Sequence, residues 1–393
     1  MRLALICQNF NARGGVSRDA FMFASALLDR GVEIACYCNP RTSTRLDGVE
    51  FHDVPSAHAS LPSRFSMPIA HTAFAYRATR AVARDRGRYD VVLVGGTDAF
   101  AHGVVRVHAV VKAENRRWPR RGGRDFRQAT LRARLAPVLR PQNGVERLIQ
   151  RRQFEAVHSS RLVAATEQVK QDVRDLYAFP AERIDVLPYP IDFGAIRAAS
   201  GADARRLIQV DAGARLVLFL GNDFYRKGLD RAIRVLPKLP RDVHLLVAGE
   251  GPTLPFRRLA SSLGVEARAH FLGHADRPER FLGDADLLLL PTREDVWGIA
   301  LIEAMAAGVP IVTTAAAGAS TVVAEAAAGL VVEPFSTDAL AEAVTRSLGD
   351  SESGRRAETR GVKVAEGFDV SRLATRLESI LERAASAPPQ VAA

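Results

Sequence analysis

The stretch from residue 284 to 314 constrains the fold more than any other part of the chain. Residues 284–290 end in four leucines and predict a buried parallel strand that stops at Pro291. Good helix formers with apolar residues at helical spacing fill residues 299–307, and a glycine and a proline follow. A second apolar strand is expected at 309–314. A strand, a polar turn, a helix and another strand in this order indicate an α/β domain with a parallel sheet.

Two carboxylates, Asp295 and Glu303, flank the glycine turn of this unit and stand eight residues apart. Asp295 falls after the strand, at the sheet edge where open α/β sheets bind ligands. The backbone N–H groups of Gly298 and Ile299 open the helix and can receive a phosphate. Carboxylates can bind the hydroxyls of a sugar, and the start of a helix can bind a phosphate. A site with both features suits a sugar nucleotide. The alternative is that both acids merely stabilise the helix dipole, which explains Asp295 better than Glu303.

A basic turn forms a second candidate site. Residues 216–220 are apolar and predict a strand, and a polar turn with Arg226 and Lys227 leads from it into a helix. Cations in such a turn can hold a diphosphate. Arg226 could instead form a salt bridge with its own helix, whereas Lys227 has no such simple structural explanation.

These two segments resemble the motifs of the retaining glycosyltransferases of family 4, which have the two-domain GT-B fold. The acid pair matches the family's Glu-x7-Glu motif, with Asp295 one methylene shorter than the usual first Glu, and residues 221–228 match Gly-x-x-x-x-Arg-Lys-Gly. The resemblance implies that Asp295 holds hydroxyls of the donor sugar, Glu303 the ribose and Lys227 the diphosphate. Within the family, the chain is most similar to the bacterial lipopolysaccharide core glucosyltransferases.

The resemblance extends to other donor contacts. Asn222 stands where some relatives have an arginine, and His274 follows a short strand where relatives pack the nucleotide base. A surface histidine is an equally good interpretation of His274. Near the start, Gly14 and Gly15 separate a strand from a helical run at 19–28 and allow close approach of a phosphate or acceptor. This turn does not match Gly-x-Gly-x-x-Gly, so a nicotinamide site has no support.

A histidine of the N-terminal half is a further candidate. His108 follows the apolar run 104–107, near the point where many relatives place a histidine or aspartate beside the donor sugar. A lone histidine at a strand end is more often structural. Tyr189 and Pro190 replace the family's Asn-Gly turn, which changes the expected donor contact there.

The chain of 393 residues, 47% of them hydrophobic, is large enough for two cores. We expect an α/β protein with two doubly wound Rossmann-like domains facing a central cleft. Residues 1–190 would bind the acceptor, 191–368 the nucleotide sugar, and 369–393 would form a crossing helix and a frayed tail. The linker is expected at 188–200, where prolines and small residues interrupt the pattern.

Positive charge is concentrated in residues 116–152. This segment has twelve arginines and two acids, a net charge of +10, which equals the formal charge of the whole chain. Interleaved apolar residues favour docking on an anionic membrane surface. A solvated, arginine-rich helix pair is the plain alternative. A nucleic-acid role lacks any accompanying recognition motif.

The sequence therefore predicts a retaining hexosyltransferase that moves a sugar, with UDP the expected nucleotide, onto a glycan, glycolipid or lipopolysaccharide-type acceptor. No cofactor and no metal are expected, because the Asp284-x-Asp286 triplet precedes its strand instead of following it. Three cysteines, an odd number, indicate thiols of a reducing compartment, so we expect a cytoplasmic protein, peripheral at the membrane if the basic segment docks there. The alternatives are a sugar-nucleotide-binding protein without turnover and a GT-B-like epimerase or phosphorylase.

Overall fold

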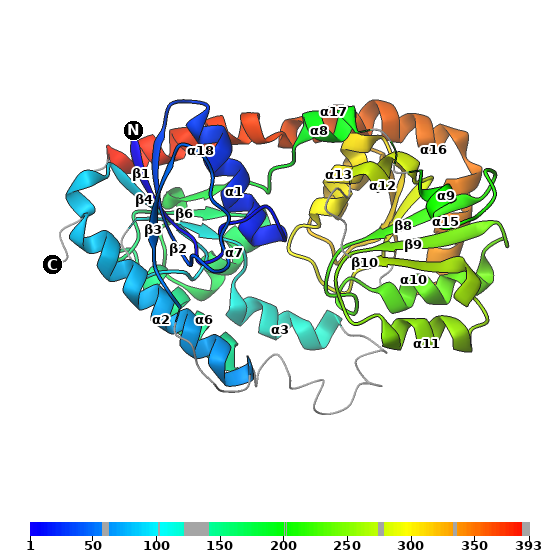
Figure 1. Ribbon diagram of the computed structural model, residues 1–393, viewed down its shortest axis with the longest axis horizontal. Coiled ribbons are helices and arrows are strands. Elements are labelled where there is room, and N and C mark those ends of the chain that lie inside the picture. The colour runs from blue at the N-terminus through cyan, green and yellow to red at the C-terminus, as the bar shows by residue number, and fades with distance from the viewer. Residues whose placement is uncertain are drawn as a thin grey trace. The chain divides into compact units, whose positions relative to one another are not determined.

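The computed structural model describes residues 1–56, 63–100, 103–121, 141–199, 201, 203–273, 279–332 and 336–386. These residues form two compact units, each with its own parallel sheet (Figure 1). The chain leaves the first unit after Pro190, forms the second unit over Ile191–Asp369, and returns to the first unit with its last helix.

The first unit is built on a seven-stranded parallel sheet with the order β3-β2-β1-β4-β5-β6-β7. Its strands are β1 (Arg2–Ile6), β2 (Glu33–Cys38), β3 (Val49–Asp53), β4 (Val91–Gly95), β5 (Val104–Val107), β6 (Arg161–Ala164) and β7 (Ile184–Val186). Strand β1 pairs with β2 on one side and with β4 on the other. The chain therefore winds outward first in one direction and then in the other, and the loops after β1 and β4 diverge at this topological switch point.

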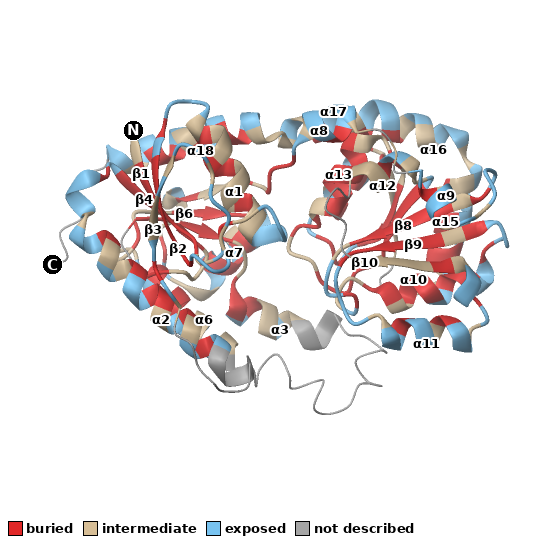
Figure 2. Ribbon diagram, viewed as in Figure 1, coloured by how far each residue is buried: buried red, intermediate tan, exposed pale blue. Residues whose placement is uncertain are grey.

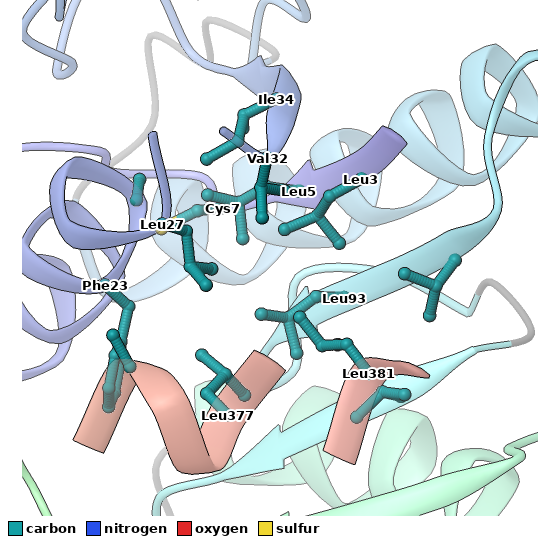
Figure 3. Close-up of a cluster of buried hydrophobic side chains, with 14 of the residues drawn as sticks. Leu3, Leu5, Cys7, Phe23, Leu27, Val32, Ile34, Leu93, Leu377 and Leu381 are labelled. Carbon is teal, nitrogen blue, oxygen red and sulfur yellow. The ribbon is translucent and has the colours of Figure 1, made fainter. Parts of the chain in front are cut away.

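Helices cover this sheet, whose central strands β1 and β4 are apolar along most of their length and largely buried. They are α1 (Gly15–Leu28), α2 (Ser63–Arg84), α3 (Val111–Arg121), α6 (Pro141–Gln153), α7 (Glu167–Leu176) and α18 (Val370–Ala385). Figure 3 shows Leu377 and Leu381 of α18 in one cluster with Leu93 of β4 and Leu27 of α1. The last helix of the chain thus completes the core of the first unit.

The second unit repeats the same winding on a six-stranded parallel sheet with the order β10-β9-β8-β11-β12-β13. Its strands are β8 (Arg215–Leu220), β9 (Val243–Ala248), β10 (Ala269–Gly273), β11 (Leu287–Leu290), β12 (Ile311–Thr314) and β13 (Gly329–Val332). Its helices are α8 (Phe193–Ala198), α9 (Ala204–Leu207), α10 (Leu229–Val235), α11 (Leu254–Ser262), α12 (Glu279–Asp284), α13 (Ile299–Ala307), α14 (Ser320–Glu325), α15 (Thr337–Gly349), α16 (Ser351–Arg356) and α17 (Val362–Ala365). The switch point of this sheet lies between β8 and β11.

The burial pattern explains the composition of the elements. Figure 2 shows the strands of both sheets as mostly buried, with exposed residues gathered on the helices. Helix α13 is an exception among the helices, because its residues from Ala300 to Ala306 are all buried. Glu303 is the one charged residue in this helix, and a carboxylate in such a position needs polar partners or a ligand.

The expected fold class of two doubly wound α/β domains is confirmed, with local differences. Helix α1 begins at Gly15 and not at Asp19, because Gly14 adopts φ 78° and lets the chain turn directly into the helix. The stretch expected as a linker contains α8, whose first turn is capped by the Asp192 carboxylate accepting from the Ala195 N–H at 2.8 Å. Among the described helices, none is both long enough and apolar enough to cross a membrane.

Candidate functional site

The basic turn of the second unit lies directly after β8. Gly228 ends this turn with φ 82° and starts α10, and a Cβ atom there would lie 2.1 Å from the carbonyl oxygen of Pro291. Only glycine permits this approach. The turn that holds Arg226 and Lys227 is therefore packed against the end of β11, across the switch point.

Lys227 contacts the acid that follows β11. Its ammonium group forms an ion pair with Oδ2 of Asp295, and both side chains are largely buried. The Arg226 guanidinium lies 3.8 Å from Oδ1 of Asp295, bonds the Asp223 carboxylate at 3.0 Å and donates to the Glu294 carbonyl at 2.9 Å. Arg226 thus serves both as a salt-bridge partner within its loop and as a cation of the site.

Asp295 stays ionised in this setting. Burial by itself would raise the pKa of the Asp295 carboxyl, but the charges of Lys227 and Arg226 hold that pKa below its usual value. A carboxylate that accepts hydrogen bonds only is suited to sugar hydroxyls. The site therefore combines two cations for an anionic group with one fixed acceptor.

A buried ion pair that the sequence analysis did not identify holds the two loops together. Arg293 donates to both carboxylate oxygens of Asp230 at 2.7 Å and to the Tyr225 carbonyl at 2.7 Å. Its guanidinium also lies 4.0 Å from the centre of the Tyr225 ring. Asp230, two positions after Gly228, and Arg293, two positions before Asp295, were the available signals, but nothing in the sequence indicates that they meet.

The start of α13 is set by a third loop. Gly298 precedes the helix with φ 89°, and the N–H of Ile299 opens its first turn. The Asp295 N–H donates to the Ala316 carbonyl at 3.1 Å, and the Gly318 N–H donates to the Asp295 carbonyl at 3.0 Å. The loops after β8, β11 and β12 are thus bonded into one frame. Glu303 lies one turn farther along α13, 6% exposed.

Two other predicted donor residues have different positions. The Asn222 side chain accepts the Glu250 N–H at 2.7 Å and so ties the loop after β8 to the loop after β9. His274 lies outside the described residues. Asp284 accepts the Ala204 N–H at 2.9 Å, and Asp286 accepts the Leu216 N–H at 2.7 Å, so both carboxylates support backbone. In the described part of the chain, no group of three His, Cys, Asp or Glu side chains gathers as metal ligands do.

The first unit has a site of its own at the equivalent place. A cavity of about 470 Å³ opens at the ends of β1 and β4, the switch point of that sheet. Gln8 and Asp98 line it, and the Asp98 carboxylate accepts the Gln8 N–H at 2.7 Å. His71 bonds the Gln8 side chain at 2.8 Å through Nδ1 and the Thr97 hydroxyl at 3.1 Å through Nε2. The sequence analysis missed these residues, which no motif marks.

His108 lies at the edge of the same cavity, directly after β5. Its Nδ1 bonds the Tyr189 hydroxyl at 2.8 Å, and the two rings stack with centroids 5.4 Å apart. Burial lowers the pKa of His108 to about 4, with Asp19 opposing the shift and Arg106 adding to it. The imidazole is therefore neutral at physiological pH and can donate or accept a hydrogen bond, but it does not carry charge.

A buried ion pair, whose arginine lies two positions before His108 in the sequence, bonds the segment that leads to Tyr189. Arg106 bonds both oxygens of Asp19 at 3.0 Å and donates to the carbonyls of Leu187 and, at 3.2 Å, Pro188. This arrangement joins β5, α1 and the segment before Tyr189. Gly14 and Gly15 begin α1, and a Cβ atom at Gly14 would meet nothing within 4 Å.

Comparisons with known proteins agree with this architecture. The sequence profile described as "Glycosyltransferase Family 4" matches residues 13–194, and the profile "Glycosyl transferases group 1" matches residues 203–364. The lipopolysaccharide glucosyltransferase WaaG of Escherichia coli is 33% identical over 211 residues, which are 51% of this chain and 56% of WaaG. A D-inositol 3-phosphate glycosyltransferase of Xylanimonas cellulosilytica is 28% identical over 88% of this chain and 85% of that protein.

Solved structures show the same fold. The crystal structure of WaaG has a TM-score of 0.76 at 24% identity and covers 96% of this chain and 99% of that one. Anabaena Alr3699/HepE in complex with UDP-glucose has a TM-score of 0.74 at 16% identity, covering 98% of this chain and 100% of that one. In sequence, the chain spans little more than half the length of the first curated relatives that it matches.

Proposed function

We propose that the chain moves a hexose from a nucleotide-sugar donor to a hydroxyl of a glycan, glycolipid or lipopolysaccharide-type acceptor. The premise is that the chain belongs to glycosyltransferase family 4. The observation that carries this proposal is the meeting of Lys227, Arg226 and Asp295 at the ends of β8 and β11. UDP is the proposed nucleotide, which the UDP-glucose complex of HepE and the glucosyltransferase WaaG support.

In the proposed reaction, the cationic side chains of Lys227 and Arg226 bind the diphosphate and balance its negative charge. Bond cleavage at the anomeric carbon leaves negative charge on the diphosphate, and preorganised cations stabilise that charge more in the transition state than before it. Asp295, kept ionised, accepts from donor-sugar hydroxyls, and Glu303 accepts from the ribose. The N–H groups at Gly298 and Ile299 complete the diphosphate contacts. The turn at Gly14 and Gly15 allows the close approach of a phosphate or an acceptor.

We further propose that transfer retains the anomeric configuration. The acceptor oxygen bonds to the anomeric carbon from the face that the diphosphate leaves, and the acceptor proton passes to a phosphate oxygen. No protein nucleophile is required in this scheme, because the acceptor oxygen itself attacks the anomeric carbon, and no metal is required, because side-chain cations neutralise the leaving group. His108, uncharged, contacts a hydroxyl of the donor sugar. Proton NMR of the product tests retention, and unchanged turnover in EDTA tests metal independence.

A sugar-nucleotide-binding protein without turnover is the main alternative, followed by a GT-B-like epimerase or phosphorylase. A binder would hold UDP through the same residues but release none from UDP-sugars. UDP release measured for a panel of UDP- and GDP-sugars, with mass spectrometry of the products, separates these cases. We expect slow UDP release from one donor even without acceptor. An epimerised donor, or a sugar phosphate formed with inorganic phosphate, would contradict the transfer reaction.

We propose, last, that the protein works in the cytoplasm at an anionic membrane surface, through the basic segment 116–152. In the described part of that segment, Arg147, Leu148, Arg151 and Arg152 are exposed on α6. Arg117 instead bonds both oxygens of the buried Asp172 at 2.6 Å, so it supports the fold. The three α6 arginines are therefore the residues to test.

Each arginine near an anionic surface contributes on the order of 1 kcal/mol, and salt screens this attraction. Co-sedimentation with phosphatidylglycerol vesicles should weaken severalfold in an Arg147/Arg151/Arg152→Ser variant and with rising salt. The matched control is Arg346→Ser, a last-turn arginine of α15 in the second unit. Equal sedimentation of wild type and the triple variant would contradict docking through α6.

A further inference from the structure

The cavity of the first unit is lined by both polar and apolar residues. Among the described residues that line it, none is lysine or arginine. Its lining instead includes three acids, namely Asp98, Glu114 and Glu146. The chain has 54 lysine and arginine residues in 393, and none of them is among the described lining residues.

Buried amides complete the lining. Gln153 is 2% exposed and donates to the carbonyls of Gly96 and Ala99 at 2.9 Å. Gln150 is 5% exposed, donates to the Ala109 carbonyl at 2.7 Å and accepts the Val111 N–H at 3.1 Å. These contacts fix the side chains in place, so the polar surface of the cavity is preorganised.

The acids of the cavity favour neutral groups over anions. Burial raises the pKa of Asp98 to about 7 and raises the pKa of Glu146 as well. A protonated carboxyl both donates and accepts, as a sugar hydroxyl does, whereas an ionised one repels phosphate. In either state the described lining residues offer no lysine or arginine as a counter-charge to an anion, and a desolvated charge without one is strongly disfavoured.

We propose that this cavity takes the acceptor and that the acceptor unit entering it is a polyhydroxylated sugar or cyclitol without phosphate or carboxylate groups. This inference rests on the proposed transferase function. A volume of about 470 Å³ suits a ligand of that size. The specificity differs from the one in the names of several curated relatives, which are D-inositol 3-phosphate glycosyltransferases.

The test compares matched acceptors with the full-length protein and its best UDP-sugar donor. The pairs are myo-inositol with myo-inositol 1-phosphate, glucose with glucose 6-phosphate, and mannose with mannose 6-phosphate. We expect at least one neutral member to accelerate UDP release about tenfold over donor alone, and every phosphate ester to be at least tenfold less effective than its neutral partner. A faster phosphate ester would overturn the inference, as would a panel without any acceleration while donor hydrolysis continues. The absence of UDP release under all conditions would instead count against the proposed function.

Two variants test the role of the acids directly. Glu146→Gln keeps the shape of the side chain, and Glu146→Lys adds a cation to the cavity. We expect the preference for the neutral member to shrink severalfold in Glu146→Gln and further in Glu146→Lys. Asp175→Gln, an exposed acid of α7 outside the cavity lining, is the matched control and should keep the wild-type preference. An unchanged preference in the folded Glu146→Gln protein would contradict the inference.

Discussion

The two switch points of this protein have the same topology and opposite chemistry. In the second unit, the loops after β8 and β11 bring Lys227 and Arg226 to a buried carboxylate. In the first unit, a cavity at the ends of β1 and β4 is lined by amides, two histidines and three acids, which come from these loops, the loop after β5 and helices α2, α3 and α6. Strand order therefore decides where a parallel sheet opens, and the loop residues decide what can bind there.

The comparison also shows that net charge is a poor guide to a site. The chain carries a formal charge of +10, which residues 116–152 alone account for. The cavity of the first unit has no cation among its described lining residues. Local placement of charge, and not the total, separates the site proposed for a diphosphate from the cavity proposed for hydroxyls.

The largest effect is expected from removing the cation of the second unit. Lys227→Ala should lower turnover about 100-fold or more, because preorganised charge on the leaving group is lost. The substitution also leaves Asp295 without its main counter-charge, so some loss of stability is expected. The double variant Lys227→Ala/Asp295→Asn should regain thermal stability without regaining activity. Turnover near the wild-type value in Lys227→Ala would contradict the proposal that the switch point of the second unit binds the diphosphate through its cations.

The next prediction concerns the separate roles of Glu303 and Asp295, the two acids of the candidate site in the second unit. Glu303→Ala should weaken UDP binding by roughly tenfold, the loss of about 1.4 kcal/mol from a charged hydrogen bond. Asp295→Ala should reduce turnover with the donor but spare UDP affinity, because UDP has no hexose. Isothermal titration with UDP alone decides this, with Glu325→Ala on α14 as the control. Equal losses of UDP affinity in both acid variants would show that the roles are not separate.

A smaller effect is expected in the first unit. Tyr189→Phe removes the hydroxyl that bonds Nδ1 of His108 at 2.8 Å. Without it, the neutral imidazole loses the bond that sets its tautomer, and we expect turnover to fall about fivefold. Nitrogen NMR of His108 should show a changed tautomer ratio, which a purely structural role of Tyr189 would not require. Tyr76→Phe, an exposed tyrosine of α2, should change neither.

The smallest effect concerns stability against pH. Burial raises the pKa of Asp98 to about 7, so the folded chain keeps a proton that the unfolded chain loses near pH 4. Stability from this group therefore falls as pH rises from about 4 to about 7 and is constant above that. The lowered pKa of His108, about 4, acts with the opposite sign between about pH 4 and 6.5. Comparing Asp98→Asn with wild type separates the two.

Calorimetry should detect this difference. Between pH 6 and pH 7, the Tm of wild type should fall relative to that of Asp98→Asn by about 2–4 °C, the shift that roughly 1 kcal/mol causes in a protein unit of this size. Parallel pH profiles for the two proteins would mean that Asp98 is ionised in the folded state, and the two switch points would then differ less than their residues suggest.

Much of the local structure followed from the sequence. The helix predicted at 299–307 is α13 over the same residues, because its apolar periodicity and flanking glycines leave few alternatives. The cations after β8 and the acid after β11 were predicted from their local turns and from the resemblance to glycosyltransferase family 4. The start of α1 and the presence of α8 were missed, since they depend on a positive φ at Gly14 and a cap at Asp192.

The sequence by itself determined which strand each loop follows and what charge that loop carries, because both depend on residues near one another in the chain. Only the tertiary structure decided which loops meet. Lys227 and Asp295 are 68 positions apart, and Arg106 and Asp19 are 87 apart. Such contacts depend on strand order and on the packing of helices against the sheet, which no local pattern encodes. The cavity of the first unit belongs to the same class, because residues from several separate elements line it.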